Sequence, residues 1–484
     1  MNEASPVRRG EMTARSSWIG MRPGLPYFVT EEGRSWTPIG QNDAITWPEL
    51  AGLFQRRDLP AVERHLRWLK ASGVTCLRLM LEYNQVEHRY FEKPAGYFVP
   101  AMVRLWDDLF RMLEDIGLCV LLTPFDTFFL WRRWRKHPYN RANGGPCADR
   151  RDLLLCPETR TVIKRRLGFA SDRWGGSPAL FAWDIWNEMH PSYGRDDPAN
   201  VWPFISDVGD WLRARETARY GRAHLQTASM FGPRLIDHPE LIEPIFHHPA
   251  LDFANTHLYE EGTIDDPADT VAPARAVGRL MRSAVRDAHD NRPVFDSEHG
   301  PIHTFKDKHH TLPEAFDDEY FRHMQWAHLA SGGAGGGMRW PNRHPHVLTP
   351  GMRAAQRAMA DFLPLIDWTR FRRRNLNEEV EVSGAKVACF ACGDAEQALL
   401  WLLRDEGFLP DGRLDPDLPA QEVRVGVPEM RAGSYRVTLY DTKRGAIVVR
   451  WRLEQTAAGR LDLPPIPLGA DITIAIQARG RAGE

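Results

Sequence analysis

The sequence predicts an α/β protein in which a (β/α)8 TIM barrel is followed by a small C-terminal all-β sandwich. Between residues 37 and 363, apolar strand-like runs alternate with amphipathic helical patterns, which makes eight strand–helix units. After about residue 370 the helical patterns stop, and short strand-like runs separated by turns continue from Val380 onward. A doubly wound open sheet is the alternative, but no glycine-rich nucleotide-binding motif follows the first strand.

The predicted domain organisation has three parts. Residues 1–24 lack periodicity and are expected to form a loose N-terminal arm, residues 25–370 the barrel, and residues 371–484 an accessory β-sandwich. The basic segment TRFRRRN, residues 369–375, is expected to connect the two domains as a solvated, charged linker.

Each barrel element follows from local periodicity. A hairpin at 27–40, turning at Glu32-Gly33, precedes the barrel, and glycines such as Gly73 are expected to end helices. The predicted barrel strands are 37–42, 74–82, 118–126, 180–188, 224–230, 251–260, 292–300 and 332–340. The predicted helices are 61–73, 101–117, 159–174, 201–219, 239–247, 270–289, 313–330 and 351–363.

Composition excludes several classes of partner. The 484 residues carry a formal net charge of −2, so no overall field attracts nucleic acid or a membrane surface. No apolar run is long enough to span a bilayer, and the N-terminus as given shows no secretory signal. A cytoplasmic location is therefore expected, or secretion if the N-terminus has been trimmed. The oligomeric state is left open.

Cysteine and tryptophan usage also carry information. A lone CxxC, Cys389 and Cys392, lies within one strand pattern, where its side chains point to opposite faces, so no shared metal site is predicted there. No cofactor is expected either. The 17 tryptophans suit a sugar-binding protein, because flat apolar sugar faces stack on aromatic rings.

The fourth predicted strand ends in an unusual polar pair. In FAWDIWNEMHP, residues 181–191, Asn187 and Glu188 directly follow buried apolar residues. Strand alternation places them on opposite faces, so a bend must bring them together. Glu188 alone is also compatible with a helix cap, but a second glutamate, Glu298, ends strand seven across the same barrel mouth.

Polar and aromatic residues stand at most of the other strand ends. Because a barrel places its active site at the C-terminal ends of its strands, we expect these residues to meet. They are Asn42, Arg78, Asp126, Asn187, Glu188, His257, Tyr259, Glu298 and Trp340. Each of Arg78, His257 and Trp340 also has a structural reading: an ion-pair partner, a hydrogen-bonded core histidine and a cap on the barrel.

With these motifs the chain resembles the retaining glycoside hydrolases of clan A, most closely the cellulase-like and mannanase-like enzymes of family 5. The resemblance covers about residues 25–365 and rests on WNE at 186–188, HLY at 257–259, SEHG at 297–300, Arg78 and Trp340. It implies that Glu188 is the acid/base and Glu298 the nucleophile.

The same resemblance assigns the neighbouring side chains to substrate and glutamate positioning. Asn187 is implied to hold the sugar 2-hydroxyl, and Arg78 and Tyr259 to keep Glu298 ionised and oriented. Asp126 departs from the family pattern, in which a histidine is common, which puts its contact with sugar in question. Two carboxylates about 5 Å apart suit double displacement independently of the resemblance.

Two other functions stay open at this stage. The first is a non-catalytic carbohydrate-binding or scaffold protein. The second is a metal-dependent hydrolase, whose ligands would come from His309, His310, His344 and His346 in loop-like stretches. The expected partner is an oligosaccharide or glycoside. The loop at 129–141, FLWRRWRKHPYNR, interleaves tryptophan with basic residues; this pattern fits a solvated loop, an anionic-sugar wall or a nucleic-acid patch.

Overall fold

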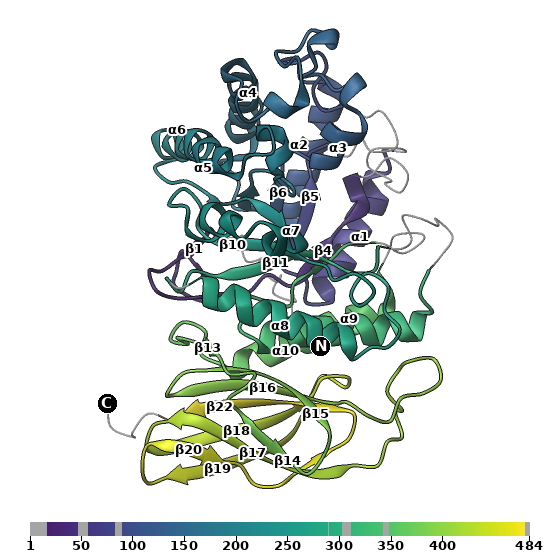
Figure 1. The fold of residues 1–484 in the computed structure, drawn as a ribbon, viewed down its shortest axis with the longest axis vertical. Helices are drawn as coiled ribbons and strands as arrows, with labels where there is room; N and C mark the ends of the chain where they lie inside the picture. The colour runs from purple at the N-terminus through teal and green to yellow at the C-terminus, as the bar shows by residue number, and fades with distance from the viewer. Residues whose placement is uncertain are drawn as a thin grey trace, which may run out of the picture.

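The computed structural model describes residues 17–46, 57–82, 90–288, 290–302, 311–341 and 348–479. These residues form a barrel surrounded by helices and, next to it, a β-sandwich (Figure 1). The predicted fold class is confirmed.

The barrel is a closed parallel sheet with the strand order β8-β7-β6-β5-β4-β12-β11-β10-β9. Its strands are β4 (Gly40–Asn42), β5 (Cys76–Met80), β6 (Cys119–Thr123), β7 (Leu180–Asp184), β8 (Leu225–Thr227), β9 (Ser229–Phe231), β10 (Ala254–Leu258), β11 (Val294–His299) and β12 (Met338–Arg339). Only Ala228 separates β8 from β9, and because β8 pairs with β7 while β9 pairs with β10, the two segments together are the fifth strand that closes the barrel.

Helices surround this sheet. They are α1 (Leu59–Ala71), α2 (Pro100–Ile116), α4 (Pro157–Trp174), α5 (Val201–Ile205), α6 (Trp211–Tyr220), α8 (Ala272–Asp287), α9 (Glu314–Ala330) and α10 (Pro350–Phe362), with two short additions after strands, α3 (Thr127–Arg132) and α7 (Gly232–Asp237). The expected helix at 239–247 is instead a 3-10 turn and a π-helical turn. Pro244, in the middle of this stretch, lacks the amide donor that a regular α-helix needs there.

Helix ends and close approaches follow local chemistry. Asp58 caps α1 by accepting a hydrogen bond from the Ala61 amide, and α2 ends at Gly117 in the left-handed conformation, with φ 76°. Gly40 in β4 has no room for a side chain, because a Cβ there would lie 1.6 Å from the Cys76 carbonyl oxygen.

A small antiparallel sheet covers the amino-terminal end of the barrel. It consists of β1 (Ile19–Met21), β2 (Phe28–Thr30) and β3 (Ser35–Trp36), and the Phe28 ring packs edge-on against Phe181 and Phe253. The predicted hairpin is therefore present, but the end of the predicted loose arm is a strand, since β1 pairs with β2 along its length. Residues 1–16 lie outside the described part of the chain.

The C-terminal unit consists of two facing antiparallel sheets. The six-stranded sheet contains β13 (Arg374–Asn375), β15 (Val387–Gly393), β16 (Gln397–Arg404), β22 (Asp471–Ala478), β18 (Gly433–Asp441) and β19 (Ala446–Gln455). The other contains β14 (Glu381–Ser383), β17 (Gln421–Met430), β20 (Gly459–Asp462) and β21 (Ile466–Leu468). Alternating apolar side chains from both sheets fill the space between them, as in a packed sandwich.

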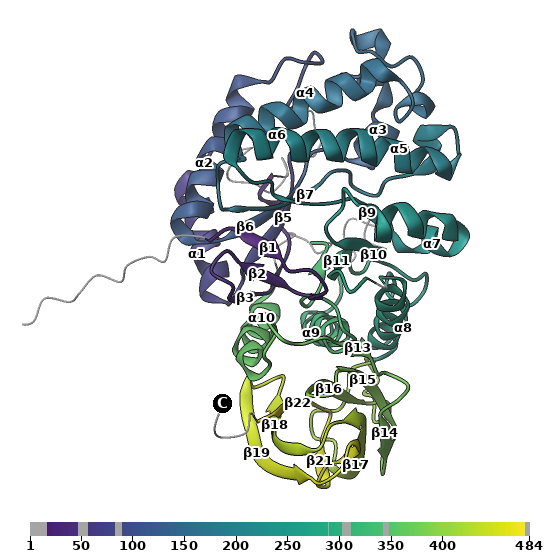
Figure 2. The same ribbon diagram turned by 90° about the vertical axis from the view of Figure 1, so that its left-hand side faces the viewer.

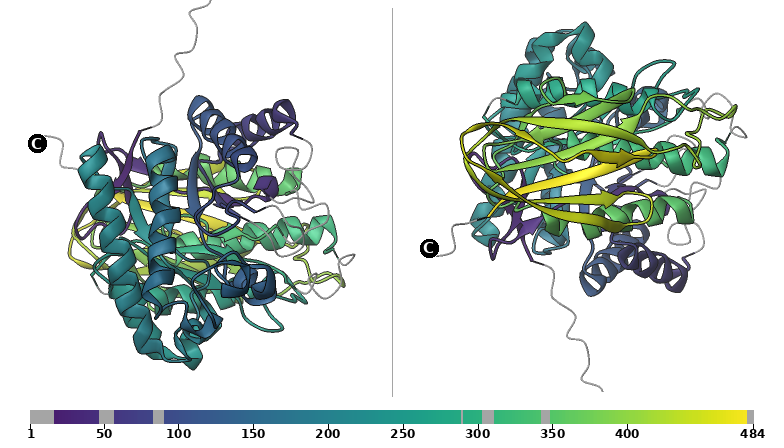
Figure 3. Two further views of the ribbon diagram at one scale, coloured as in Figure 1. Left: turned by 90° about the horizontal axis from the view of Figure 1, so that it is seen from above. Right: turned by 90° about the horizontal axis from the view of Figure 1, so that it is seen from below.

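The sandwich packs against the helices α8, α9 and α10, which lie between it and the barrel strands (Figure 2). Seen from below, its sheets lie across these helices (Figure 3). Arg322 of α9 forms an ion pair with Asp471 of β22 at 2.7 Å, and Tyr440 donates a hydrogen bond to the Ala358 carbonyl at 2.8 Å. Polar contacts thus connect the two units.

The connecting segment 369–375 differs from the expected solvated linker. Phe371 and Arg373 are buried, and Arg373 Nε donates to the Gly332 carbonyl oxygen at 2.7 Å while its guanidinium lies over the Tyr27 ring. Burial of these two side chains fixes the start of the sandwich against the barrel. None of the helices in the described part of the chain is both long and apolar enough to cross a bilayer.

Candidate active site

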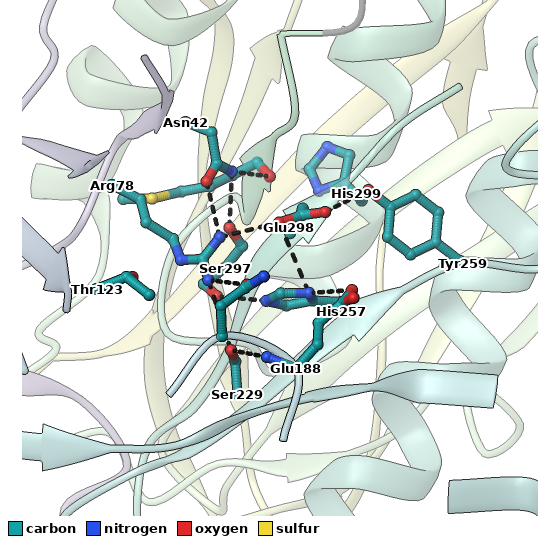
Figure 4. Close-up of polar contacts among 12 residues, drawn as sticks. Asn42, Arg78, Thr123, Glu188, Ser229, His257, Tyr259, Ser297, Glu298 and His299 are labelled. Carbon is teal, nitrogen blue, oxygen red and sulfur yellow. Dashed lines mark hydrogen bonds and ion pairs between the residues drawn. The ribbon is translucent and has the colours of Figure 1, made fainter. Parts of the chain in front are cut away.

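The C-terminal ends of the barrel strands bring polar side chains from distant parts of the chain together (Figure 4). Arg78 comes from β5, His257 from β10 and Glu298 from β11, and Glu188 follows β7. All four side chains are buried. Parallel strands carry their carboxyl ends to one rim, which is why residues more than 200 positions apart meet here.

Arg78 is the centre of the hydrogen-bond network. Its Nη2 donates to Asp184 Oδ2 at 2.7 Å and to Asn187 Oδ1 at 2.6 Å. Its Nη1 donates to Glu298 Oε2 and to Asn42 Oδ1, both at 2.9 Å. The buried guanidinium is therefore paired with two carboxylates and fixes both Asn187 and Glu298.

Asp184 is a member of this network that the sequence analysis missed. Besides Arg78, its carboxylate accepts hydrogen bonds from the Ser229 amide (2.9 Å), the Ser229 hydroxyl (3.0 Å) and Thr123 Oγ1 (3.2 Å). A charged residue within the apolar run Phe181–Ile185 was the available signal, because a buried carboxylate requires partners.

Glu188 lies on a bend of the chain. Its φ of 49° is in the left-handed region, which an L-residue with a long side chain rarely adopts, and this bend allows Asn187 and Glu188 to face the same cavity. Ser229 Oγ accepts a hydrogen bond from its amide at 3.1 Å, and Thr127 Oγ1 donates to its carbonyl at 2.7 Å. The expected bend is present, and neighbouring hydroxyls hold it.

Two other side chains contact the two glutamates. Tyr259 OH donates to Glu298 Oε1 at 2.9 Å. His257 Nδ1 lies 2.7 Å from Glu188 Oε1 and 3.7 Å from Glu298 Oε2, and its Nε2 lies 3.1 Å from Ser297 Oγ. Burial lowers the pKa of His257 to about 4, so its imidazole is neutral at pH 7.

Both glutamates are shifted towards the protonated form. Burial raises the pKa of Glu188 to about 8, and Arg78 opposes this shift while Asp126 adds to it. Burial raises the pKa of Glu298 to about 7 and the neighbouring Glu188 adds to this shift, whereas His257, Arg78 and the Tyr259 hydrogen bond oppose it. Arg78 thus favours the charged form of Glu298 as expected, but burial outweighs it.

The nine predicted site residues divide into two layers. A cavity of about 530 Å³ is lined by Asn187, Glu188, Tyr259, Glu298 and Trp340. Asn42, Arg78, Asp126 and His257 do not line it: the last three contact residues of the cavity wall directly, whereas Asn42 accepts a hydrogen bond from Arg78. Asp126 caps α3 through the Phe128 and Phe129 amides, both at 3.1 Å, and accepts a hydrogen bond from Asn187 Nδ2 at 3.0 Å, so it orients Asn187 from behind.

Glu188, His257 and Glu298 are also the described residues that could together hold a metal ion, since one ligand atom of each lies within 4.8 Å of the others. Arg78 Nη1 contacts Glu298 Oε2, however, and a cation beside a guanidinium is disfavoured by repulsion between like charges. The donor set fits hydrogen bonding between a neutral imidazole and carboxyl groups better than it fits metal coordination.

The other predicted or excluded ligand groups lie elsewhere. Cys392 packs towards the barrel and Cys389 towards the sandwich core, in keeping with strand alternation. Burial raises the pKa of each thiol to about 12. His309, His310, His344 and His346 lie outside the described residues.

Comparisons with known proteins concern the fold. The sequence matches no protein-family model, and no curated protein matches it. A glycoside hydrolase family 5 structure from Bacteroides vulgatus aligns with a TM-score of 0.61 at 9% identity, over 95% of this chain and 94% of that one. A family 5 mannosidase from Rhizomucor miehei aligns with a TM-score of 0.50 at 14% identity, over 68% of this chain and 86% of that one.

A third structure, the endo-beta-1,4-mannanase from Thermotoga petrophila, aligns with a TM-score of 0.50 at 14% identity, over 89% of this chain and 92% of that one. The Bacteroides alignment spans nearly the whole of both chains, so it includes the sandwich as well as the barrel. The chain therefore has the fold of the family 5 glycoside hydrolases, and the resemblance expected from its motifs is confirmed at the level of the fold.

Proposed function

We propose that this protein is a retaining glycoside hydrolase in which Glu188 is the acid/base and Glu298 the nucleophile. The observation that carries the proposal is a pair of buried carboxyl groups, with oxygens within 4.8 Å of each other, in one cavity at the C-terminal mouth of the barrel. Carboxyl groups about 5–5.5 Å apart support double displacement, whereas an inverting enzyme needs a wider gap for water.

The contacts support this division of roles. Glu298 contacts the Arg78 guanidinium and the Tyr259 hydroxyl, which stabilise a carboxylate. Glu188 has no direct cation contact among the described residues, and its pKa, raised by burial to about 8, keeps it protonated at neutral pH. A nucleophile must be ionised and a general acid protonated. Glu298, with the lower pKa of about 7, is the more readily ionised of the two and suits the first task, and Glu188 suits the second.

The reaction then proceeds in two balanced steps. Glu188 donates its proton to the glycosidic oxygen while a Glu298 carboxylate oxygen attacks the anomeric carbon, so the glycosidic bond breaks and a glycosyl ester forms. In the second step Glu188, now a carboxylate, removes a proton from water, and the resulting hydroxyl attacks the anomeric carbon and releases Glu298. Two inversions leave the configuration at that carbon unchanged.

The supporting residues fit this scheme. Asn187 uses its oxygen and one amide hydrogen on Arg78 and Asp126, so its second amide hydrogen is left for a sugar hydroxyl in the cavity that it lines. Neutral His257 orients the Glu188 carboxyl group through the hydrogen bond between its Nδ1 and Glu188 Oε1. Trp340 lines the same cavity and offers a ring on which a sugar can stack.

Azide rescue of the two glutamate variants tests the proposal. Because two of the structural neighbours are a mannosidase and a mannanase, dinitrophenyl β-mannoside is the first substrate to use, followed by other β-glycosides. Glu188→Ala should still form the intermediate from this activated substrate, and azide should release a glycosyl azide of retained configuration. Glu298→Ala should give the inverted azide.

Glu216→Gln is a matched control. Glu216, on helix α6, is also buried, but its carboxylate accepts hydrogen bonds from Trp183 and Ser171, away from the cavity. It should show no azide effect. Inversion by the wild-type enzyme would disprove the mechanism. Binding of glycans without turnover of any of them would favour a carbohydrate-binding protein instead.

A further inference from the structure

Arginines line part of the catalytic cavity. Besides the two glutamates, the charged residues that line the cavity in the described part of the chain are Arg132, Arg150 and Arg234. Arg132 ends the short helix α3, whereas Arg150 and Arg234 come from the loop after α3 and from α7. Three separate segments therefore place arginines around one sugar-sized cavity.

A second depression, of about 480 Å³, adjoins the catalytic cavity. It shares Trp131, Arg132 and Arg150 with the catalytic cavity. Its remaining lining adds three further cations, Arg133, Arg135 and Lys136, and one carboxylate, Asp149. That carboxylate is already held by Arg151, whose Nη2 lies 2.7 Å from Asp149 Oδ2. The depression thus has a large excess of positive charge.

Arg132 and Arg150 are not neutralised by the described parts of the protein. Neither arginine has an ion-pair partner among the described residues. Arg132 lies 6.0 Å from the Trp131 ring centre, and Arg150 Nη1 donates to the Trp131 carbonyl at 3.2 Å. By contrast, Arg151 and Arg195 in the same region are paired with aspartates.

Trp131 contacts both arginines, through its ring and its carbonyl oxygen respectively, and is 53% exposed. Trp134, the other tryptophan of the loop, is partly buried and packs against the core. A large exposed aromatic ring in a depression is the usual platform for a sugar, and the arginines beside it add charged donors at its edge.

We propose, on the basis of the proposed hydrolase function, that the substrate is a glycan bearing anionic groups, and that Trp131, Arg132 and Arg150 form a subsite for an acidic sugar next to the point of cleavage. The acidic group is a carboxylate, as in a uronic acid, or a sulfate, and a guanidinium can bind either with two parallel hydrogen bonds.

A glycan fits this surface better than a nucleic acid does. The basic depression opens into the cavity that holds Glu188 and Glu298, where a continuous phosphate backbone would meet two carboxyl groups. One exposed tryptophan also provides stacking for one ring, whereas single-stranded nucleic acids are bound by a series of aromatic side chains along a groove.

Calorimetric binding to the inactive Glu298→Ala variant tests the proposal without requiring turnover. The ligands are matched oligosaccharides of one backbone: neutral, C6-carboxylated and 6-O-sulfated manno-oligosaccharides, and the same three forms of cello-oligosaccharides. We expect an acidic form of at least one backbone to bind about tenfold more tightly than its neutral form. This preference should weaken between about 50 and about 300 mM salt, because the arginines are solvent-accessible.

The Arg132→Gln/Arg150→Gln pair, made in the same background, should remove the preference, so that the acidic and neutral glycans of that backbone bind equally. The control pair Arg436→Gln/Arg450→Gln, two exposed arginines of the sandwich, should leave it intact. The tighter of the carboxylate and sulfate arms identifies the acidic group.

Several results would overturn the proposal. These are equal binding of neutral and acidic forms on both backbones, a preference that survives in the Arg132/Arg150 variant, or tighter binding of a single-stranded oligonucleotide than of any glycan. Absence of binding by all six glycans would overturn it too. If the acidic preference holds but the wild-type protein hydrolyses no glycoside, the hydrolase function fails and the acidic-sugar site stands.

Discussion

Replacing Arg78 with methionine tests how the site controls its two glutamates. The change keeps an unbranched side chain but removes the charge that contacts Asp184 and Glu298. Arg78 and Asp184 are both fully buried in their side chains, at 0% exposure. The variant therefore leaves a buried carboxylate without its cation.

The expected loss of stability is about 3 kcal/mol. Removing one partner of a buried ion pair costs about 3–5 kcal/mol, and the lower end applies here because Ser229 and Thr123 still donate hydrogen bonds to Asp184. Urea unfolding at neutral pH measures this difference.

The pH dependence of activity should also move in a defined direction. Arg78 lowers the pKa of both Glu298 and Glu188, so its removal raises both. Since the nucleophile must be ionised, the acidic limb of the kcat/KM profile should move to higher pH by about one pH unit or more, and the basic limb should follow in the same direction. Activity should therefore fall more at pH 6 than at pH 8.

Two further variants make the measurement decisive. Arg339→Met removes another fully buried arginine, paired with Asp317 at 2.6 Å, which contacts neither glutamate; it should lose comparable stability without moving the pH limbs. Arg78→Lys restores a charge and should recover part of the acidic limb. The reasoning is refuted if folded Arg78→Met keeps the wild-type pH profile, or if Arg339→Met shifts it equally.

Three other changes have defined outcomes. Trp340→Ala should lower transition-state stabilisation by roughly 1–3 kcal/mol, measured as kcat/KM, and an unchanged value would exclude sugar stacking on this ring. Glu188→Gln should stabilise the fold relative to wild type, and more at pH 8 than at pH 5. Burial raises the pKa of Glu188 in the folded state to about 8, so the stability of the wild-type protein falls as the pH rises from about 4.5 to 8. Urea unfolding at the two pH values checks this. Deleting residues 373–484 should damage stability more than intrinsic catalysis, because the sandwich residues Phe390 and Trp401 pack into the barrel's core cluster; a folded truncated barrel that binds substrate but does not turn it over would contradict this.

The location of the site followed from the sequence because it depends on periodicity alone. Eight alternating strand and helix patterns favour a parallel barrel over an open sheet, and a parallel barrel brings the ends of all its strands to one rim. Glu188 and Glu298 could therefore be placed in one cavity, although 110 residues separate them. The same argument grouped Asn187, Tyr259 and Trp340 with them.

The contacts made by side chains behind the cavity wall depend on side-chain direction and strand register, which local sequence patterns do not specify. Asp184 meets Arg78 only because β5 and β7 turn these side chains towards the same interior space. Asp126 has the position expected from the sequence, but the start of α3 turns its carboxylate to helix capping and to Asn187, away from the cavity surface.

Tertiary structure alone decided the path of the connecting segments. Residues 19–21 have no periodicity by which to recognise a strand, yet they pair with β2 because the hairpin edge offers them hydrogen bonds. Arg373 lies in a run of charges that suggests solvent, but packing of the sandwich against α8, α9 and α10 buries it. Arg150 and Arg234 line one cavity because the segments that follow β6 and β9 both lie at the mouth of the barrel. The periodicity of apolar residues indicates which face of a helix or strand is buried, so the sequence alone determined the barrel and the rim at which its strands end. Contacts between irregular segments form only when distant parts of the chain pack together, so they could not be predicted from local patterns.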